Sequence, residues 1–200
     1  MAGLPVLPVG GPNDRAGVDA AIGKFARLVV VGDDAELALV LSRLLRAERL
    51  DVEVGYVARR RTPATGVYRL PTGRRAARRA RYGTALPMPL IRDDTGTALV
   101  GVAHWLPAGD TRLLHGEGIV DDHALFDGDV AGVRIEPTPG VPGLRTAVRP
   151  GRGRMRRWVR GRAAQLGTTG ARVVRDGVSG ARTVKRSTFY RHVEGWLLVR

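Results

Sequence analysis

The sequence contains no cysteine, few aromatic residues and almost no lysine. The absence of cysteine from the 200 residues excludes disulfide bonds and thiolate metal sites. Aromatic residues make up 5% of the chain, while its 27 glycines and 12 prolines predict many short elements rather than long helices. No apolar run approaches the roughly 20 residues that a membrane-spanning helix needs. We therefore expect a cytoplasmic protein without a transmembrane segment, with peripheral binding at the inner membrane face left open.

The charge of the chain is strongly positive and unevenly distributed. The formal net charge is +14, and the cations are almost all arginine, since Lys24 and Lys185 are the only lysines. Residues 59–81 carry nine arginines and residues 137–175 carry ten, and neither segment contains an acidic residue. A GC-rich genome explains arginine in place of lysine, but it does not explain the separation of the charges. The pattern favours an anionic partner.

The stretch from residue 25 to residue 49 predicts a buried strand, a glycine turn and a helix in succession. Residues 28–31 are aliphatic, and Gly32 begins a tight turn. Apolar residues then recur at the three- and four-residue spacing of one helix face: Leu37, Val40, Leu41, Leu44 and Leu45. Such a unit is either an ordinary part of an open sheet or a phosphate site at the turn. Three acidic residues weigh against the phosphate site: Asp33, Asp34 and Glu36.

The rest of the first half predicts short elements around this unit. Residues 52–58 predict a second strand, parallel to the first and joined to it by a right-handed crossover. Residues 14–26 predict a helix, and residues 6–9 and 67–70 predict further strands. Residues 74–81 consist of alanine and arginine and predict a helix with one very basic face. That helix is read either as a solvated surface helix or as an anion-binding one.

From Leu86 onward the pattern changes to short strands separated by turns, and helical periodicity is nearly absent. The strand-like segments are residues 86–91, 97–105, 118–120, 130–135, 144–148, 158–166, 171–175, 182–191 and 196–199. The predicted fold is a truncated parallel α/β sheet domain over residues 1–88, followed by an antiparallel β-sandwich domain over residues 89–200.

Common catalytic motifs are absent. The four histidines form no H-E-x-x-H pair, and the chain has neither a G-x-S-x-G elbow nor a G-x-x-x-x-G-K-[ST] loop. An acidic cluster that contains Asp127 and Asp129 offers oxygen ligands suited to Mg²⁺ or Ca²⁺. The alternative for this cluster is a polar hairpin loop. The sequence therefore gives no support to a zinc hydrolase, a serine hydrolase or a Walker-type NTPase.

Four segments together suggest a family. They are VVVGDDAELALVLSRLL at 29–45, LPTGRRAARRARYG at 70–83, HALFDGDVAGVRI at 123–135 and ARVVRDGVSGARTVKRSTFY at 171–190. In this order they resemble the GGDGT loop and helix, the Pro-x-Gly-Thr turn and helix, the Asp-Gly segment and the closing Asp-Gly-Glu segment of the diacylglycerol kinase catalytic family. In that family an N-terminal α/β domain and a C-terminal β-sandwich flank an ATP cleft.

The resemblance assigns roles to individual residues. It implies that Gly32, Asp34 and Gly73 contact the cofactor, and that Asp176 is the general base which takes the proton from the lipid hydroxyl. It also implies a structural Mg²⁺ near Asp127 and Asp129. Mg²⁺ and ATP are expected as cofactors only if kinase activity is retained.

Departures from the family pattern fall on functional positions. Asp33, Ala35 and Glu36 stand where the GGDGT loop has glycine, glycine and threonine. Arg74 replaces the threonine after Gly73, and Val178 replaces the glutamate of the closing motif. The first half, at roughly 85 residues, is also short for the family domain. The resemblance therefore implies a degenerate relative in which ATP binding is lost.

Three hypotheses remain, each for a different functional class of protein. The first is a lipid-kinase-like protein without phosphotransfer that binds an anionic phospholipid headgroup, a nucleotide or another polyanion near the cleft between the domains. Its candidate anion-binding residues are Arg74, Arg75, Arg78, Arg79, Arg154, Arg156 and Arg157. The second is an active lipid kinase, and the third is a basic nucleic-acid-binding protein. Association into a homo-oligomer is left open.

Overall fold

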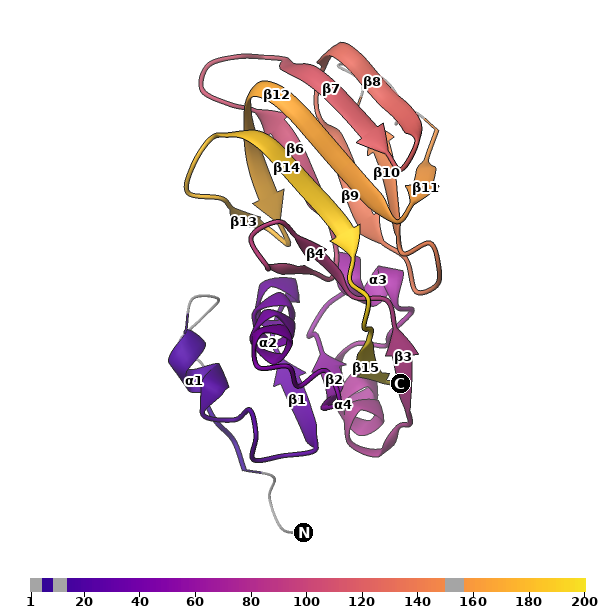
Figure 1. The fold of residues 1–200 in the computed structure, drawn as a ribbon. Helices are drawn as coiled ribbons and strands as arrows, with labels where there is room; N and C mark the ends of the chain where they lie inside the picture. Colours follow the sequence, from indigo (N-terminus) through magenta and orange to yellow (C-terminus); the bar gives the residue numbers. More distant parts are fainter. Residues whose placement is uncertain (1–4, 9–13, 150–156) are drawn as a thin grey trace.

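The computed structural model describes residues 5–8, 14–149 and 157–200, which form two lobes (Figure 1). The lower lobe is built on a four-stranded sheet in the order β1-β2-β15-β3. β1, β2 and β15 are parallel to one another, and β3 runs antiparallel to β15. The strands span Arg27–Val31 (β1), Glu53–Val57 (β2), Trp196–Val199 (β15) and Ala85–Met88 (β3).

Four helices belong to this lobe: α1 (Arg15–Asp19), α2 (Asp34–Arg46), α3 (Pro63–Val67) and α4 (Gly73–Tyr82). Val30 and Val54 pack in the core that contains α2, whereas Val29 and Val57 pack with α4. Because successive strand residues point to opposite faces, α2 and α4 cover opposite faces of the sheet. α3 lies between the two lobes (Figure 1). Within the described residues, no helix combines the length and the apolar character needed to cross a membrane.

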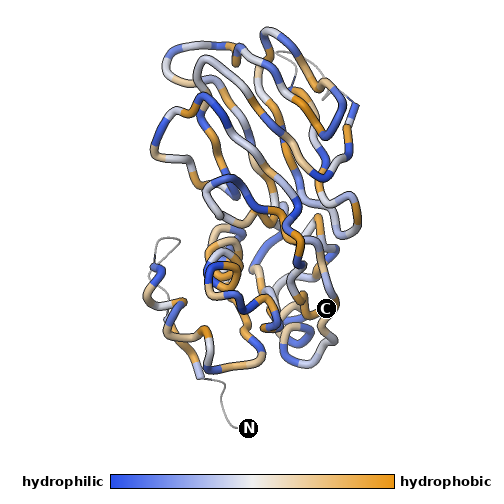
Figure 2. The backbone as a smooth tube through the Cα atoms, in the orientation of Figure 1, coloured by the Kyte–Doolittle hydropathy of each residue, from blue (hydrophilic) through white to orange (hydrophobic). Residues whose placement is uncertain are grey.

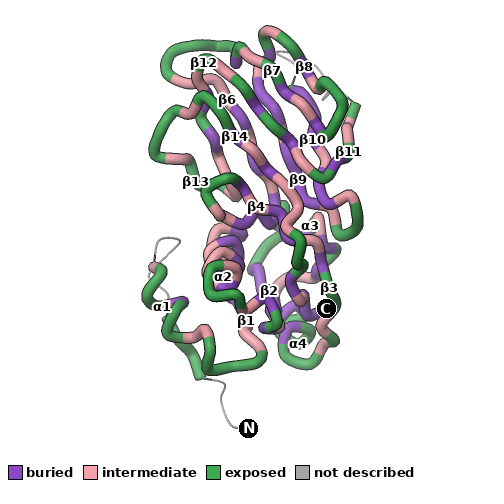
Figure 3. The backbone as a smooth tube through the Cα atoms, viewed as in Figure 1, coloured by how far each residue is buried: buried purple, intermediate pink, exposed green. Residues whose placement is uncertain are grey.

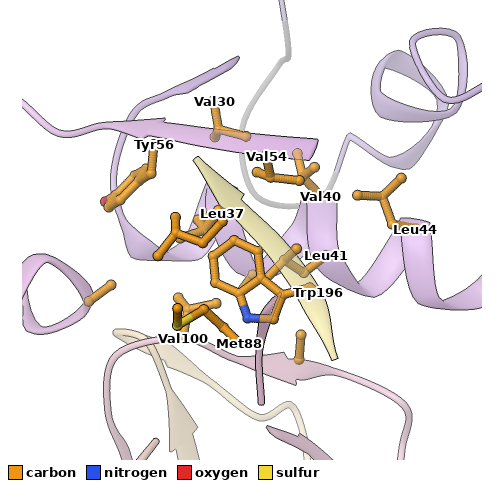
Figure 4. Close-up of a cluster of buried hydrophobic side chains, with 14 of the residues drawn as sticks. Val30, Leu37, Val40, Leu41, Leu44, Val54, Tyr56, Met88, Val100 and Trp196 are labelled. Atoms are coloured by element: carbon orange, nitrogen blue, oxygen red, sulfur yellow. The ribbon is translucent and has the colours of Figure 1, made fainter. Parts of the chain in front are cut away.

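The core of the lower lobe joins α2 to the last strand of the chain. Leu37, Leu41 and Leu44 are fully buried, as the three- and four-residue spacing predicts. Figure 4 shows Trp196 of β15 among these side chains. Trp196 is 1% exposed and makes an edge-on contact with Tyr68, with 5.4 Å between ring centroids. The C-terminal strand β15 is thus part of the lower lobe.

The upper lobe is an antiparallel sheet of eleven strands that folds over on itself into a sandwich. Its main path runs β11-β10-β9-β6-β12-β14-β4-β5, with β7, β8 and β13 attached through β12. The strands span Ile91–Asp93 (β4), Ala98–Leu99 (β5), Ala103–Pro107 (β6), Leu114–Val120 (β7), His123–Val130 (β8), Val133–Pro137 (β9), Leu144–Val148 (β10), Val159–Gly161 (β11), Ala163–Arg175 (β12), Val178–Ser179 (β13) and Val184–Arg191 (β14).

The long strand β12 connects the two layers of the sandwich. Its first half pairs with β7 and β14, and its second half pairs with β6. The register shifts between Gly167 and Ala171, which lets the strand turn from one layer to the other. Trp105 and Phe189, both fully buried, fill the space between the layers. Figure 3 shows the buried stretches along the facing strands, and Figure 2 shows the alternation of apolar and polar residues along them.

The predicted fold class is confirmed, and several local predictions differ from the structure, among them the following. Residues 67–70 form the end of α3 and a turn rather than a strand, since Thr62 caps a helix with Pro63 at its first position. The helix predicted over residues 14–26 is limited to α1, and residues 6–8 of the predicted edge strand are not in a strand. Residues 196–199, placed in the sandwich by the predicted boundary, return to the lower sheet because Trp196 and Leu198 complete its core.

Candidate functional site

The carboxyl ends of β1 and β2 point toward the sandwich, and the candidate site lies where the lobes meet (Figure 1). In open α/β sheets this edge is the usual place for a ligand. Asp34, at the first position of α2, and Asp176, at the end of β12, both reach this place. Gly101 separates them: a Cβ atom there would lie 2.6 Å from Asp34 Oδ2, while its backbone N–H donates to Asp176 Oδ1 at 2.8 Å.

The turn between β1 and α2 is closed by its own carboxylates. Asp33 caps α2 by accepting the backbone N–H of Ala35 at 2.9 Å, and Glu36 accepts the backbone N–H of Asp33 at 2.8 Å. This reciprocal capping box occupies donors that a phosphate would need at a helix N-terminus. Hydrogen bonding between the two carboxyl groups raises the pKa of Glu36 and lowers that of Asp33. The turn is therefore an ordinary, well-capped helix start.

Asp34 is a buried bridge between α2 and α3. Its side chain, in a residue 5% exposed, accepts the phenol O–H of Tyr56 at 2.9 Å and the backbone N–H of Ala64 at 3.0 Å. Ala64 lies in the first turn of α3, so the carboxylate also serves that helix N-terminus. Burial, and then the charge of Asp34, raise the pKa of Tyr56 above its usual value. Both oxygens of Asp34 thus have structural partners.

Asp176 occupies a tight turn between β12 and β13. Its φ of 46° lies in the left-handed region, and Gly177 follows with a φ of 84°. Its carboxylate accepts three consecutive backbone N–H groups, those of Val100 at 3.0 Å, Gly101 at 2.8 Å and Val102 at 2.9 Å. Burial raises the pKa of Asp176 to about 7, against these three hydrogen bonds, which lower it; the charge of Asp34 raises it further. Asp176 can therefore hold or release a proton near neutral pH.

A cavity of about 310 Å³ opens between α2 and the sandwich beside Asp176. Four arginines line it: Arg15, Arg43, Arg46 and Arg175. Arg43 is paired with Asp19 at 2.6 Å, and Arg175 is paired with the buried Asp93. Arg15 and Arg46 are exposed and form no ion pair within the described residues. Among the described residues, the cavity thus offers two arginines without an ion pair and one carboxyl group, that of Asp176, with a pKa of about 7.

α4 presents a separate basic surface. Ala76 and Ala80 are buried against β2, where a Cβ on Gly55 would lie 2.6 Å from that of Ala80. Because the helix approaches the sheet so closely, its large side chains point away from it, and Figure 3 shows α4 as mostly exposed. We call the exposed side chains of Arg74, Arg75, Arg78 and Arg79 the α4 arginine face. None of these four residues lines the cavity between the lobes, which lies on the α2 side of the sheet.

The start of α4 differs from that of α2. Gly73 adopts a φ of 59°, and its N–H donates to Ala58 O at 2.9 Å at the end of β2. The N-cap residue Thr72 makes no side-chain capping hydrogen bond. Arg59, Arg60 and Arg61, which follow β2, are also exposed. This end of α4 therefore lacks a side-chain cap and lies among positive charges.

The remaining predicted site residues lie in the sandwich. Arg157 is exposed, and Arg154 and Arg156 fall outside the described residues. Asp127 and Asp129 lie on β8, where Asp129 Oδ1 is 2.9 Å from His115 Nδ1. In the part of the chain that is described, no group of three or more His, Cys, Asp or Glu side chains is placed to hold a metal ion. The Mg²⁺ assignment stays a prediction.

Sequence reasoning missed the arginines of the cavity and the backbone donors around Asp176. Arg15, Arg46 and Arg175 come from α1, α2 and β12, which are far apart in the chain. No local spacing can indicate that they meet. The donors at residues 100–102 are backbone N–H groups, so the side chains at these positions could not have indicated the contact with Asp176.

No family model matches this chain, and no curated protein matches it by sequence. Solved structures do match its fold. A putative diacylglycerol kinase from Bacillus anthracis str. Sterne has a TM-score of 0.71 over 94% of this chain and 82% of that chain, at 8% identity. An NAD kinase from Archaeoglobus fulgidus in complex with ATP has a TM-score of 0.57 over 88% and 78%, at 12% identity. This chain has the diacylglycerol kinase and NAD kinase fold. At such identities the likeness establishes the fold alone.

Proposed function

We propose that this kinase-like protein binds an anionic phospholipid through the α4 arginine face and does not transfer a phosphoryl group. The observation that carries the proposal is the contrast between two helix starts at the same sheet edge. The start of α2 is occupied by the protein's own carboxylates, whereas the start of α4 has no side-chain cap and is surrounded by arginine.

The loss of phosphotransfer follows from the turn after β1. Phosphoryl transfer needs donors and cations around the phosphate groups, which carry several negative charges. Here the carboxylates of Asp33 and Glu36 accept hydrogen bonds from nearby backbone N–H groups. The carboxylate of Asp34 accepts hydrogen bonds from Tyr56 and Ala64. A nucleotide phosphate at this turn would meet three carboxyl groups and few free N–H groups. Weak binding of ATP is the expected result.

Lipid binding follows from the geometry of α4. Positions 74, 75, 78 and 79 fall on one side of a helix of 3.6 residues per turn, so their charges form one continuous face. The helix contains no acidic residue. Tyr82, the last residue of α4, is 68% exposed, and Leu86 on β3 is 37% exposed; both supply apolar contact. Arginines beside exposed aromatic and aliphatic groups suit the surface of an anionic membrane.

Co-sedimentation with vesicles tests the lipid proposal. The wild-type protein is expected to bind phosphatidylglycerol vesicles and to dissociate from them when salt is added. It is not expected to bind phosphatidylcholine vesicles. Each basic residue near an anionic membrane contributes about 1 kcal/mol, so Arg75→Glu/Arg78→Glu should weaken binding at least about 30-fold. The charge-matched control is Arg182→Glu/Arg186→Glu, at exposed positions of the sandwich. Equal losses in both double variants would contradict a specific role for α4.

A third pair of substitutions separates the α4 arginine face from the cavity. Arg15→Glu/Arg46→Glu reverses the two free charges of the cavity and leaves α4 intact. We expect this variant to bind vesicles like the wild type. If it alone loses binding, the anionic ligand belongs in the cavity and the assignment to α4 is wrong.

An active lipid kinase is the second candidate function, and one observation favours it. Asp176 lies beside Asp34 at the cleft with a pKa of about 7, a value suited to a general base. Radiolabelled ATP and diacylglycerol decide between the two functions. The proposal predicts no transfer above that of a blank. Transfer that disappears in Asp176→Asn would establish the kinase instead.

A further inference from the structure

The outer face of the sandwich carries a second basic surface that the kinase-like site does not use. In the layer formed by β11, β10, β9, β6 and the second half of β12, side chains alternate between the core and the outside. Trp105, Val133 and Ile135 point inward and are fully buried. Their neighbours therefore point outward, and cross-strand pairing sets them side by side.

Arginines dominate this outer face. Arg134 lies on β9 opposite His104, Arg145 lies on β10 opposite both Glu136 and Arg160, and Arg172 lies on β12 opposite Leu106. Neighbouring strands are about 4.8 Å apart, and the strand registers place these arginines on one face of the sheet, along a diagonal from Arg160 and Arg145 through Arg134 to Arg172. We call the following residues the arginine platform: Arg134, Arg145, Arg149, Arg160, Arg172 and Trp158.

Arg149 belongs to this face although it follows the end of β10. His104, an outward residue of β6, has its pKa lowered by burial first and then by the charges of Arg134 and Arg149. Arg149 therefore lies near His104. Glu136 is the only carboxylate in β6, β9, β10, β11 and residues 171–175 of β12, all of which the structure describes. One negative charge thus faces five arginines.

The single glutamate fixes the orientation of two arginines without using up their donors. Glu136 is 6% exposed; its Oε1 accepts Arg134 Nε at 2.7 Å, and its Oε2 accepts Arg145 Nε at 2.8 Å. Each guanidinium carries five N–H donors, so most of them remain free for phosphate oxygens. Arg160 and Arg172 are exposed and form no ion pair in the described part of the chain.

An aromatic ring completes the platform. The guanidinium of Arg145 lies over the ring of Trp158, 4.4 Å from its centroid. Trp158 is partly exposed, whereas Trp105 and Trp196 are buried. Flat guanidinium and aromatic groups on a sheet are the groups on which nucleic-acid bases stack, while neighbouring arginines hold the phosphates.

We propose that the arginine platform binds single-stranded nucleic acid. Two observations favour a nucleic acid over a membrane. Among the described residues, no large apolar side chain of β6, β9, β10, β11 or β12 is highly exposed, and the guanidinium of Arg145 lies over the partly exposed ring of Trp158, so the platform has few groups to insert among lipids. The platform also has a carboxylate, Glu136, that orients two of its arginines, whereas no ion pair within the described residues involves the α4 arginine face. The binding is expected to be tolerant of sequence, because contacts to phosphates and ring faces carry little sequence information.

Intrinsic fluorescence tests this proposal, since Trp158 is the only partly exposed tryptophan of the three. Addition of a 20-nucleotide oligouridine should change the tryptophan emission of the wild type, and Trp158→Phe should remove that change. Fluorescence anisotropy with the same oligonucleotide, labelled with fluorescein, gives the association constant. The logarithm of this constant should fall linearly with the logarithm of the salt concentration. The slope of this line is expected to fall by roughly 1.4 in Arg160→Glu/Arg172→Glu, because two phosphate contacts are lost.

A matched variant distinguishes the platform from general attraction to a basic protein. Arg160→Glu/Arg172→Glu should weaken oligouridine binding at least about tenfold, whereas Arg75→Glu/Arg78→Glu, with the same charge change on α4, should weaken it less than about threefold. Both variants are checked for wild-type circular dichroism. Equal weakening by the two variants, an unchanged Trp158 emission, or a larger emission change with phosphatidylglycerol vesicles than with oligouridine would each overturn the proposal.

Discussion

The starts of α2 and α4 differ although both lie near the carboxyl ends of the parallel pair β1 and β2: α2 follows β1 directly, and the N–H of Gly73 at the start of α4 donates to Ala58 O just after β2. At α2, Asp33 and Glu36 satisfy the first donors and Asp34 is buried beneath them. At α4, Thr72 provides no side-chain cap, Gly73 adopts a positive φ, and arginines follow at once. A helix start binds an anion only when its donors are free. Our proposal therefore places an anion at the start of α4 and not at the start of α2.

The largest effect in this comparison is expected from Asp34→Ala. The substitution leaves the Tyr56 hydroxyl and the Ala64 N–H buried without an acceptor, which should lower the free energy of unfolding by about 2–4 kcal/mol. Urea unfolding measures this loss. Asp51→Ala, which removes an exposed carboxylate, is the control and should leave the free energy of unfolding almost unchanged. A loss at Asp34 as small as that at Asp51 would show that the bridge is not structural.

A pH effect is expected from Asp176. Because its pKa in the folded protein, about 7, is above its usual value of 3.8, the folded state keeps a proton that the unfolded state has lost between these values. The contribution of Asp176 to stability should therefore fall as pH rises from about 4 to 7. Between pH 5 and pH 8 the wild type should lose about 1–2 kcal/mol relative to Asp176→Asn, because the partial exposure of Asp176 to solvent limits the effect. Parallel stability curves for the two proteins would contradict this.

A smaller effect is expected when the two N-caps are removed. Asp33→Ala should lower the free energy of unfolding by about 1 kcal/mol, since it removes the hydrogen bond to the Ala35 N–H. Thr72→Ala is the matched change at α4 and should cost almost nothing, because Thr72 makes no capping hydrogen bond. Thermal unfolding of both variants compares them directly. Similar losses in the two variants would remove the distinction between the helix starts.

The smallest expected effect is a gain. Thr72→Asp places a capping carboxylate at the start of α4 and should stabilise the protein by about 0.5 kcal/mol. The same carboxylate would occupy the free donors near Arg74 and Arg75 and should weaken binding to phosphatidylglycerol vesicles. Thermal unfolding and co-sedimentation report the two halves of this prediction. Stronger vesicle binding in this variant would argue against an anion at this position.

Local patterns predicted the elements whose burial follows their own periodicity. Leu37, Leu41 and Leu44 indicated α2, and the aliphatic residues of β1 and β2 indicated a parallel pair. The return of Trp196 to the first lobe was missed because an apolar strand does not specify which sheet it joins. Likewise, Thr62 and Pro63 could have indicated α3, but residues 67–70 resemble a strand when read without that cap.

The candidate site was also predictable only in part, because local patterns do not show which distant segments pack together. The carboxylates after Gly32 are adjacent in sequence, so their negative charge at the turn could be anticipated. The contact of Asp176 with the backbone of residues 100–102 depends on the packing of two turns about 75 residues apart, as the separation of Asp176 and Gly101 shows. The pairing of Glu136 with both Arg134 and Arg145 depends on strand register. Neither arrangement leaves a pattern in the sequence.

Backbone amide NMR with a soluble short-chain phosphatidic acid tests the central claim most directly, because it compares the two helix starts in one experiment. The account predicts saturable shifts for the amides of residues 73–76 and no comparable shifts for residues 32–36 at the start of α2. The α4 shifts should be lost in Arg75→Glu/Arg78→Glu. Saturable shifts at residues 32–36 with none at residues 73–76 would contradict the account and return the anion to the turn after β1.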